Sequence, residues 1–301
     1  MWETKMRHHT NVLFASVLIS FSVCICGGSL DFKVVDLTHN HSNTSIKWPG
    51  NPEYNFTILS RGKTADGLWL EMNYFGTAEH AGTHLDSPAH FYKDRNRTHN
   101  VPLENLIGPG VIINVKNKAA INADYRVSID DLKQWENMYG KIPENAIVIM
   151  NSGWHKHYPN ASLVFNTNNF TDPSTFHFPA WHEDAIEWII SERSVNVVGV
   201  DTPSTDFGQT KNFAVHTSLG KANISGAENV ANLDALPESG SMIFVAVTKI
   251  FDGSGGPARI FATVAIKDTS FECTHGPCFV LFLSALCIII PLLAHMYHRT
   301  M

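Results

Sequence analysis

Cysteine is absent from the whole middle of the chain. The five cysteines all lie near the two ends, and none occurs between residues 27 and 272. Because no thiol is present there, that stretch has no candidate for a cysteine nucleophile. It also lacks the Gly-x-Ser-x-Gly sequence that carries the nucleophilic serine of many α/β hydrolases. Any hydrolysis in this part of the chain therefore needs a different nucleophile.

An excess of positive charge is also lacking. The formal net charge is −6 and the sequence pI is about 6.2, so we expect no nucleic-acid partner. No Gly/Ser-rich linker, internal repeat or long low-complexity tract divides the chain. With 301 residues and 44% hydrophobic content, the chain can bury one substantial core. We expect a single domain over residues 29–270.

Long apolar runs occur only near the two ends. Residues 12–26 form a short apolar run after Lys5 and Arg7 and before a Gly-Gly-Ser sequence, which predicts a signal peptide over residues 1–28. Asn-x-Ser/Thr sequons agree with passage through the secretory pathway and occur at Asn40, Asn43, Asn55, Asn96, Asn160, Asn169 and Asn223. We expect an extracellular or lumenal domain, at the cell surface or attached to a membrane.

The C-terminal run, residues 279–294, has competing interpretations. A helix of this length spans about 24 Å, which is short of a hydrocarbon core of roughly 30 Å but workable with bilayer thinning. A single-pass helix with a polar stub bearing Arg299 is slightly favoured over a lipid-anchor signal, and a buried soluble helix is the third interpretation. Cys273 and Cys278 precede the run and can pair in an oxidising compartment.

Side chains that bind metals are concentrated in residues 80–90. The run is His-Ala-Gly-Thr-His-Leu-Asp-Ser-Pro-Ala-His. Imidazole and carboxylate together suit Zn²⁺ or a similar divalent ion, whose water becomes acidic enough to supply hydroxide near neutral pH. A single histidine in a chain with 16 of them means little, but this set at this spacing indicates a metal site and hydrolysis.

The spacing within the loop indicates a role for each residue. His84 and Asp86 are two positions apart, so on an extended strand both point to the same side. Gly82 lets the chain turn and bring His80 alongside them. Pro88, in the exit from the loop, stiffens it and holds His90 near the ion, where a general acid/base would lie.

This loop resembles the hallmark of the cyclase-like metal hydrolases, a family that includes bacterial kynurenine formamidase and isatin hydrolase. The pattern is His-x-Gly-Thr-His-x-Asp-x-Pro-x-His, and residues 80–90 match every fixed position. Further similar segments are residues 36–39 (Asp-Leu-Thr-His), 48–50 (Trp-Pro-Gly), 200–204, 215–216, 228–233 and 255–259. The resemblance covers residues 33–267, almost all of the chain between its apolar ends.

By resemblance, His80, His84 and Asp86 are metal ligands and His90 is the catalytic acid/base. His216 and Glu228, twelve residues apart, match the pair that holds a second ion in the formamidases. Asp86 has two oxygens and can bridge two ions. The resemblance implies Zn²⁺, as one ion or two, with Mn²⁺ as an alternative. Without it, His216 would be interpreted as a strand-end histidine and Glu228 as a surface carboxylate.

Other positions carry weaker signals. Trp48, before a Pro-Gly turn, is either a contact for an aromatic substrate or a core tryptophan. We interpret Asp201, Ser204 and Asp206 as structural turn residues. Asp36 and His39 are candidates for hydrogen bonds to the ligating imidazoles. Metal sites usually need such hydrogen bonds to orient the ligating rings.

The order of apolar segments predicts a mixed α/β fold. Strands buried on both faces are expected at residues 111–115, 146–150, 195–200, 241–250 and 259–266, and helices at 128–138 and 182–192, the first with Ser128 and Asp131 as a capping pair. The resemblance implies a swivelling β/β/α domain with a barrel-like sheet, and a homo-oligomer.

For activity, the resemblance puts arylformamidase first, acting on N-formylkynurenine. An isatin-hydrolase-like cyclic amidase is the second choice, and both take a small aromatic amide as substrate. A cell-surface binding protein that keeps the metal loop without turnover is the alternative from another class. His90 favours catalysis, because a binder needs no proton carrier there.

Overall fold

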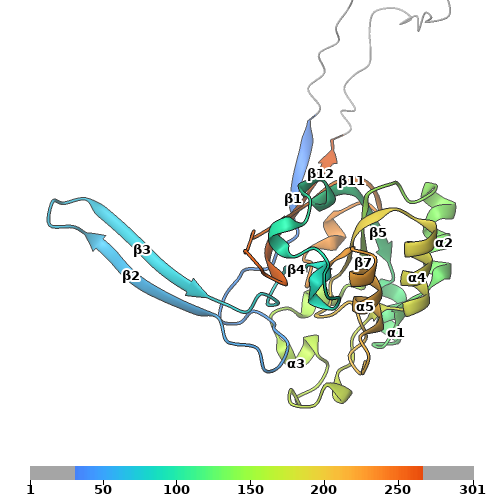
Figure 1. Ribbon diagram of the computed structural model, residues 1–301, viewed down its shortest axis with the longest axis horizontal. Coiled ribbons are helices and arrows are strands. Elements are labelled where there is room, and N and C mark those ends of the chain that lie inside the picture. The colour runs from blue at the N-terminus through green and yellow to red at the C-terminus, as the bar shows by residue number, and fades with distance from the viewer. Residues whose placement is uncertain (1–30, 267–301) are drawn as a thin grey trace, which may run out of the picture. The chain divides into compact units, whose positions relative to one another are not determined.

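The computed structural model describes residues 31–266 (Figure 1). The predicted signal peptide, the apolar run 279–294 and the Cys273–Cys278 pair lie outside these residues, so those three predictions stay predictions. Within residues 31–266, no helix is both long enough and apolar enough to span a bilayer.

Seven strands close into a ring. Their order is β12 (Gly255–Ala265), β11 (Ser239–Val247), β5 (Ile107–Asn114), β7 (Ala146–Asn151), β9 (Val195–Val200), β10 (Ser225–Glu228) and β4 (His84–Asp86), and the start of β12 pairs with β4 to complete the ring. Strand β1 (Phe32–Asp36) pairs with the later part of β12, on the edge of β12 that lies away from β11. The pairs β5–β7, β7–β9 and β9–β10 are parallel, and the rest are antiparallel. The mixed α/β class and the barrel-like sheet are confirmed.

The parallel strands are buried on both faces because apolar residues run through them almost without interruption. Alternate side chains of β5, β7 and β9 point into the barrel, where they pack with Leu37, Leu85 and Ile260. The remaining ones meet the helices α2 (Ile129–Tyr139), α4 (Glu183–Glu192) and α5 (Ala214–Lys221) on the outside. In the described part of the chain, helices therefore cover the barrel along its parallel strands.

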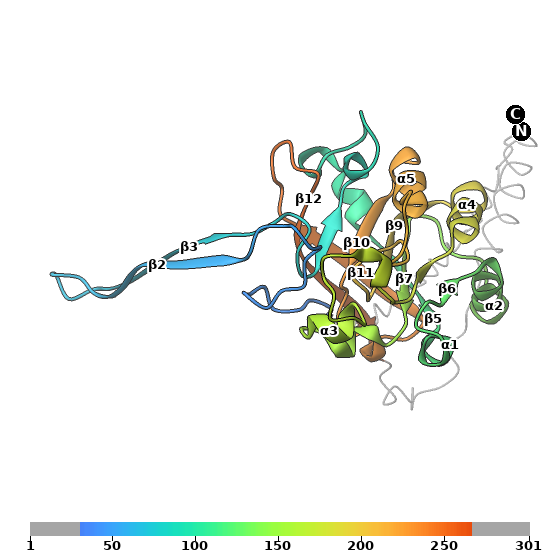
Figure 2. The same ribbon diagram turned by 90° about the horizontal axis from the view of Figure 1, so that it is seen from below.

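The smaller elements are α1 (Lys116–Ile121), α3 (Ala161–Val164), β6 (Arg126–Val127), β8 (Ala180–Trp181) and short 3₁₀ turns. The hairpin of β2 (Asn55–Lys63) and β3 (Trp69–Gly76) extends away from the barrel as a separate two-stranded sheet (Figures 1 and 2). The sequence did not predict this hairpin.

All five predicted strands and both predicted helices are present, with shifted ends. The capping pair is confirmed, since Ser128 Oγ accepts from the Asp131 amide at 3.4 Å and Asp131 accepts from the Ser128 amide at 2.8 Å. One expectation was wrong. Strands β11 and β12 are not buried on both faces but alternate between buried and exposed residues, because no helix within residues 31–266 covers their outer side.

Candidate metal centre

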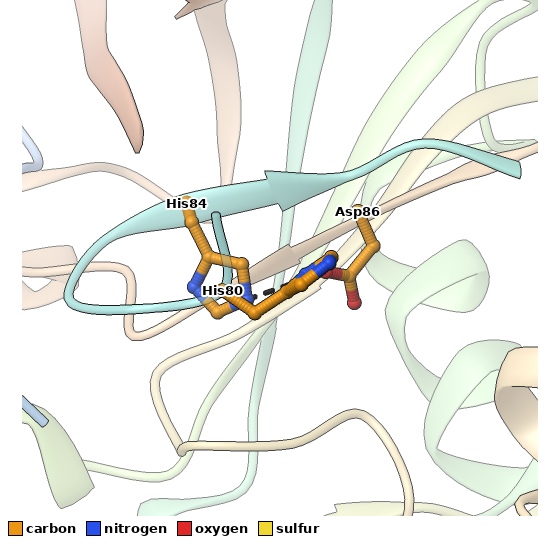
Figure 3. Close-up of side chains that lie close together, drawn as sticks. All are labelled: His80, His84 and Asp86. Atoms are coloured by element: carbon orange, nitrogen blue, oxygen red, sulfur yellow. Dashed lines mark hydrogen bonds and ion pairs between the residues drawn. The ribbon is translucent and has the colours of Figure 1, made fainter. Parts of the chain in front are cut away.

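The predicted metal loop is built around strand β4. His84 and Asp86 occupy alternate positions of that strand, so both side chains point to the same side, as the spacing predicted (Figure 3). Gly82 turns the chain before the strand with φ of +62°, and a Cβ there would lie 2.9 Å from His41 Nδ1. Only glycine fits this turn, which brings His80 back beside the strand.

His80 is held from two sides. Its Nδ1 lies 2.6 Å from Asp86 Oδ1 and its Nε2 lies 2.9 Å from Ser254 Oγ. The Ser254 hydroxyl in turn donates to Glu79 Oε2 at 2.7 Å. The next residue, Gly255, packs so closely that an added Cβ would collide with the His80 ring and the Leu85 carbonyl. The beginning of β12 therefore sets the orientation of the His80 ring.

His216 and Glu228 join the loop from distant parts of the chain. Glu228 ends strand β10 directly opposite His84 in the antiparallel pair β10–β4. His216 lies in the first turn of α5, not at a strand end. Its Nε2 is 3.1 Å from Glu228 Oε1 and 3.3 Å from Asp86 Oδ2. All five predicted ligands thus converge on one site.

The geometry of these donors fits a divalent ion. The Nε2 of His84 lies 3.3 Å from Asp86 Oδ1 and 3.4 Å from Glu228 Oε2. Two ligands at bonds of about 2.1 Å in a tetrahedral zinc site are about 3.4 Å apart, which matches these separations. His84 Nε2 and Asp86 Oδ2 are also buried without a hydrogen-bond partner within residues 31–266. Buried polar atoms of this kind are rare unless they bind something.

Among residues 31–266, two groups of three residues have ligand atoms close enough to share an ion. One is His80, His84 and Asp86, and the other is Asp86, His90 and His216. Asp86 belongs to both, as expected for a bridging carboxylate. His90 appears in the second group, so its position also suits a ligand, and its role as acid/base needs the test described in the Discussion.

The buried carboxylates of Asp86 and Glu228 make the site favourable for positive charge. Burial by itself raises the pKa of the Asp86 carboxyl, but the surrounding imidazoles outweigh burial and hold this pKa well below its usual range. Burial lowers the pKa of His84, yet its bonds to Asp86 and Glu228 reverse this and raise the pKa to about 10. The negative charge of the two buried carboxylates is thus balanced by protonated imidazoles, and a divalent ion can balance it in the same way.

His90 lies on the 3₁₀ turn Pro88–His90, with Pro88 at its first position. Its ring stacks on His80 with centroids 3.8 Å apart and planes at 19°. Burial lowers the pKa of His90 to about 4. The imidazole is therefore neutral at pH 7 and can accept a proton from a group in the pocket.

Asp206, which the sequence suggested was only a turn residue, orients His216. Its Oδ2 lies 2.6 Å from His216 Nδ1, and its two oxygens accept from the backbone amides of Val215 and His216 at 3.0 Å. Nothing in the sequence marked it, apart from its position two residues beyond the Asp-Thr-Pro-Ser segment that follows a buried strand. A carboxylate behind a ligating imidazole is the arrangement that metal sites commonly use.

The hypothesis for Asp36 and His39 was wrong. Asp36 pairs with Arg259 on the surface, at 2.6 Å. The His39 ring stacks on Tyr158 with centroids 3.8 Å apart. Neither side chain bonds a ligating imidazole. Asp201 is structural, as predicted, since it accepts from Ser152 Oγ at 2.6 Å.

A pocket of about 210 Å³ opens over the centre. Its walls include His90 and all five predicted ligands. Three aromatic side chains, Trp48, Phe91 and Phe213, form its apolar part. Trp48 also contacts Phe213 edge-on at 6.4 Å and Phe176 at 5.4 Å, so it serves both the core and the pocket. The pocket is suited to a small molecule with an aromatic ring.

The family model of the cyclases matches residues 35–207. Among curated proteins, isatin hydrolase of Roseibium aggregatum is 31% identical over 208 residues, which cover 66% of this chain and 77% of the relative. Kynurenine formamidase of Bacillus mycoides is 26% identical over 225 residues, covering 75% of this chain and 94% of the relative.

Solved structures show the same likeness. An isatin hydrolase bound to the product analogue thioisatinate has a TM-score of 0.71 and 29% identity, covering 78% of this chain and 93% of the other. Isatin hydrolase A from Ralstonia solanacearum gives 0.71 and 32%, covering 77% and 92%. The fold and the cluster of imidazoles and carboxylates are those of a metal-dependent hydrolase. The chain belongs to the cyclase family, as the resemblance of its metal loop predicted.

Proposed function

We propose that this chain hydrolyses an amide bond attached to an aromatic ring, with isatin as its first substrate. The observation that carries the proposal is the pocket in which three aromatic side chains face the predicted ligands and His90. A flat aromatic amide can stack against Trp48, Phe91 and Phe213 while its carbonyl reaches the polar end. The likeness to isatin hydrolases supports the cyclic amide over the formamide that the sequence put first.

The chain's own residues divide the work. His80, His84, Asp86, His216 and Glu228 would hold the ion, which when bound supplies Lewis acidity at the amide carbonyl. His90 is neutral and accepts the proton of the attacking water. It then returns that proton to the departing nitrogen, so no net charge accumulates. Asp86, buried beside it, favours the transient imidazolium.

N-formylkynurenine is the second candidate substrate. The kynurenine formamidases align over a larger share of this chain than isatin hydrolase does, 75% against 66%. Zinc-loaded full chain should be given isatin and N-formylkynurenine in parallel, with ring opening and kynurenine release followed by absorbance. We expect faster turnover of isatin. Turnover of N-formylkynurenine alone would reverse the assignment, and metal binding without turnover of either would indicate a binding protein.

We propose zinc as the metal and two ions as its number, with His80, His84, Asp86, His216 and Glu228 as the residues that would hold them. The five nitrogen and oxygen ligands suit zinc, with manganese as the alternative. Mass spectrometry of metal in the purified chain should give two equivalents of zinc, and the Glu228→Gln variant should keep one. One equivalent in both proteins, or manganese in both, would contradict this.

We also propose that the domain is glycosylated in the secretory pathway. The sequon residues Asn40, Asn43, Asn55, Asn160 and Asn169 are exposed. Asn96 and Asn223 are half-buried, and Asn223 Oδ1 accepts a hydrogen bond from the backbone amide of Asn96 at 3.1 Å, so we expect a glycan least at Asn223. Treating the protein from eukaryotic cells with an N-glycosidase should reduce its mass. No change in mass would refute the proposal.

A further inference from the structure

Glu79, Ser254 and His80 form a chain of hydrogen bonds beside the candidate metal centre. His80 Nε2 lies 2.9 Å from Ser254 Oγ, and Ser254 Oγ lies 2.7 Å from Glu79 Oε2. Glu79 Oε2 is 3.9 Å from His80 Nε2, which is too far for a direct hydrogen bond. The serine hydroxyl therefore connects the carboxylate to the imidazole. We call Glu79 and Ser254 the hydroxyl bridge.

The direction of each hydrogen bond in this chain follows from the donors present. An ionised carboxylate can only accept, and a hydroxyl has a single proton to donate. The Ser254 hydroxyl therefore donates to Glu79, to which the Ser254 backbone amide also donates at 3.0 Å. Only lone pairs of the hydroxyl are then left for His80. His80 Nε2 consequently carries a proton and donates it to Ser254 Oγ.

The other ring nitrogen of His80 faces the centre. His80 Nδ1 lies 2.6 Å from Asp86 Oδ1 (Figure 3). The ionised Asp86 carboxylate is an acceptor as well, so Nδ1 can meet it only through a cation, either a proton or a metal ion. Because Nε2 already holds the one proton of a neutral imidazole, Nδ1 of the neutral ring keeps its lone pair for a metal ion.

The two other ligating imidazoles present the opposite nitrogen to the centre. His84 Nδ1 lies 2.9 Å from the Gly82 carbonyl, which can only accept, so the proton of this ring is on Nδ1. His216 Nδ1 lies 2.6 Å from Asp206 Oδ2, and its Nε2 is 3.3 Å from Asp86 Oδ2. Both rings therefore offer Nε2 as the ligand atom. A different acceptor fixes the protonated nitrogen of each ring.

We propose that the hydroxyl bridge makes His80 bind the metal through Nδ1. It does so by keeping the proton of the ring on Nε2, so that no change of tautomer is needed when the ion binds. Glu79 and Ser254 are positioning residues, because both act through His80. The proposal rests on the metal centre of the proposed function and applies whichever amide is the substrate.

Glycines on both sides of Ser254 let the hydroxyl bridge form. A Cβ at Gly253 would lie 2.8 Å from Glu79 Oε1, and a Cβ at Gly255 would collide with the His80 ring. A larger residue at either position would displace one end of the bridge. The close packing on both sides therefore keeps the carboxylate and the imidazole within reach of the same hydroxyl.

The backbone of Ser254 is anchored independently of its hydroxyl. Its carbonyl accepts from the Ser87 backbone amide at 2.9 Å and from the Ser87 hydroxyl at 2.6 Å. Removing the Ser254 hydroxyl leaves these contacts with the exit of the metal loop in place. A Ser254→Ala variant therefore tests the hydrogen bond to His80 rather than the fold around it.

Zinc affinity of the purified full chain is the first test, measured by competition with a fluorescent chelator. Ser254→Ala and Glu79→Gln should each bind zinc about tenfold to hundredfold more weakly, the usual effect of losing a group that orients a ligating imidazole. Glutamine keeps the shape of Glu79 but can donate as well as accept. It therefore no longer dictates the direction of the serine hydroxyl.

Two substitutions of the same kinds serve as controls. Ser241→Ala removes a buried hydroxyl that has no hydrogen-bond partner within residues 31–266. Glu144→Gln removes a carboxylate from an exposed position. Both variants should bind zinc like the native chain. Circular dichroism of every variant checks that the barrel remains folded.

Nuclear magnetic resonance of the zinc-loaded chain tests the nitrogen itself. Long-range proton–nitrogen correlations of isotope-labelled histidine distinguish Nδ1 from Nε2, and the His80 signals are those absent from a His80→Gln variant. We expect the proton on Nε2 of His80 and on Nδ1 of His84 and His216. In Ser254→Ala, the Nε2 proton of His80 should exchange with water faster than in the native chain, because its acceptor is gone.

Zinc-bound His80 with its proton on Nδ1 would overturn the proposal, and so would native zinc affinity in both Ser254→Ala and Glu79→Gln. In either case the native chain would still bind zinc, so the metal centre would stand and only the role of the hydroxyl bridge would be wrong. A native chain that binds no zinc would instead refute the metal centre, and this proposal with it.

Discussion

Replacing Asp206 with asparagine should weaken metal binding although Asp206 is not a ligand. The substitution keeps the shape of the side chain and removes its charge. In the native chain, Asp206 Oδ2 lies 2.6 Å from His216 Nδ1, and the carboxylate also accepts from two amides at the start of α5. Asparagine has only one acceptor oxygen for these three donors.

The magnitude follows from these lost bonds. A carboxylate that orients a ligating imidazole typically contributes tenfold to hundredfold in metal affinity, which is about 1.4–2.7 kcal/mol. The helix loses part of its N-terminal capping as well, because Phe213 at the cap position has no side-chain acceptor. That loss costs about 1 kcal/mol of folding stability.

The assay is competition for zinc against a fluorescent chelator at fixed pH, with urea unfolding measured alongside. Asp184→Asn is the matched control, because Asp184 lies in the first turn of α4 with its side chain 74% exposed. We expect Asp184→Asn to bind zinc like the native chain and Asp206→Asn to bind it tenfold to hundredfold more weakly. Native zinc affinity in Asp206→Asn would refute the reasoning, and would show that packing alone orients His216.

Three further predictions concern other parts of the domain. His90→Ala should retain its metal and lose at least about a hundredfold in turnover, as measured by metal analysis and steady-state kinetics; loss of the metal would make His90 a ligand instead. Gly255→Ala should lose metal affinity, because the added methyl collides with the His80 ring, and zinc titration should show weaker binding in a chain with a native circular dichroism spectrum. Burial raises the pKa of Asp131, but its bonds to Lys118 and Ser128 prevail and hold the pKa below its usual value. Its stabilising effect is therefore complete above the unfolded pKa of about 3.9 and disappears as the pH falls through the folded value, so urea unfolding between pH 5 and 2 should show a shallower loss of stability in Asp131→Asn than in the native chain.

The sequence predicted the interior of the barrel better than its surroundings. Residues 146–150 are a continuous apolar run, and such a run has few alternatives to a strand buried on both faces. The β2–β3 hairpin could not be predicted in this way. Its large apolar residues lie on both faces and stay between 38% and 68% exposed, although Phe75 stacks on Tyr54 with centroids 6.3 Å apart. An apolar pattern indicates which residues are buried within the chain, so it cannot predict a hairpin whose apolar residues stay exposed.

The sequence alone predicted those ligands of the candidate site that lie in one loop. His80, His84 and Asp86 are close in sequence, so elementary strand geometry brings them together. His216 and Glu228 came only from family resemblance, because their approach depends on how β10 and α5 pack. Asp206 was missed because its function depends on hydrogen bonds to Val215 and His216, nine and ten positions away, and no short motif marks them.

The contact between His80 and Ser254 constrains how the protein is made. The two residues are 174 positions apart, and the Ser87 amide also bonds the Ser254 carbonyl at 2.9 Å. During translation, the metal loop therefore leaves the ribosome before Ser254 and strand β12, which orient His80, have been synthesised. We therefore expect tight zinc binding only after β12 has been translated. A nascent chain, or a protein truncated before β12, should lose the metal to cellular chelators.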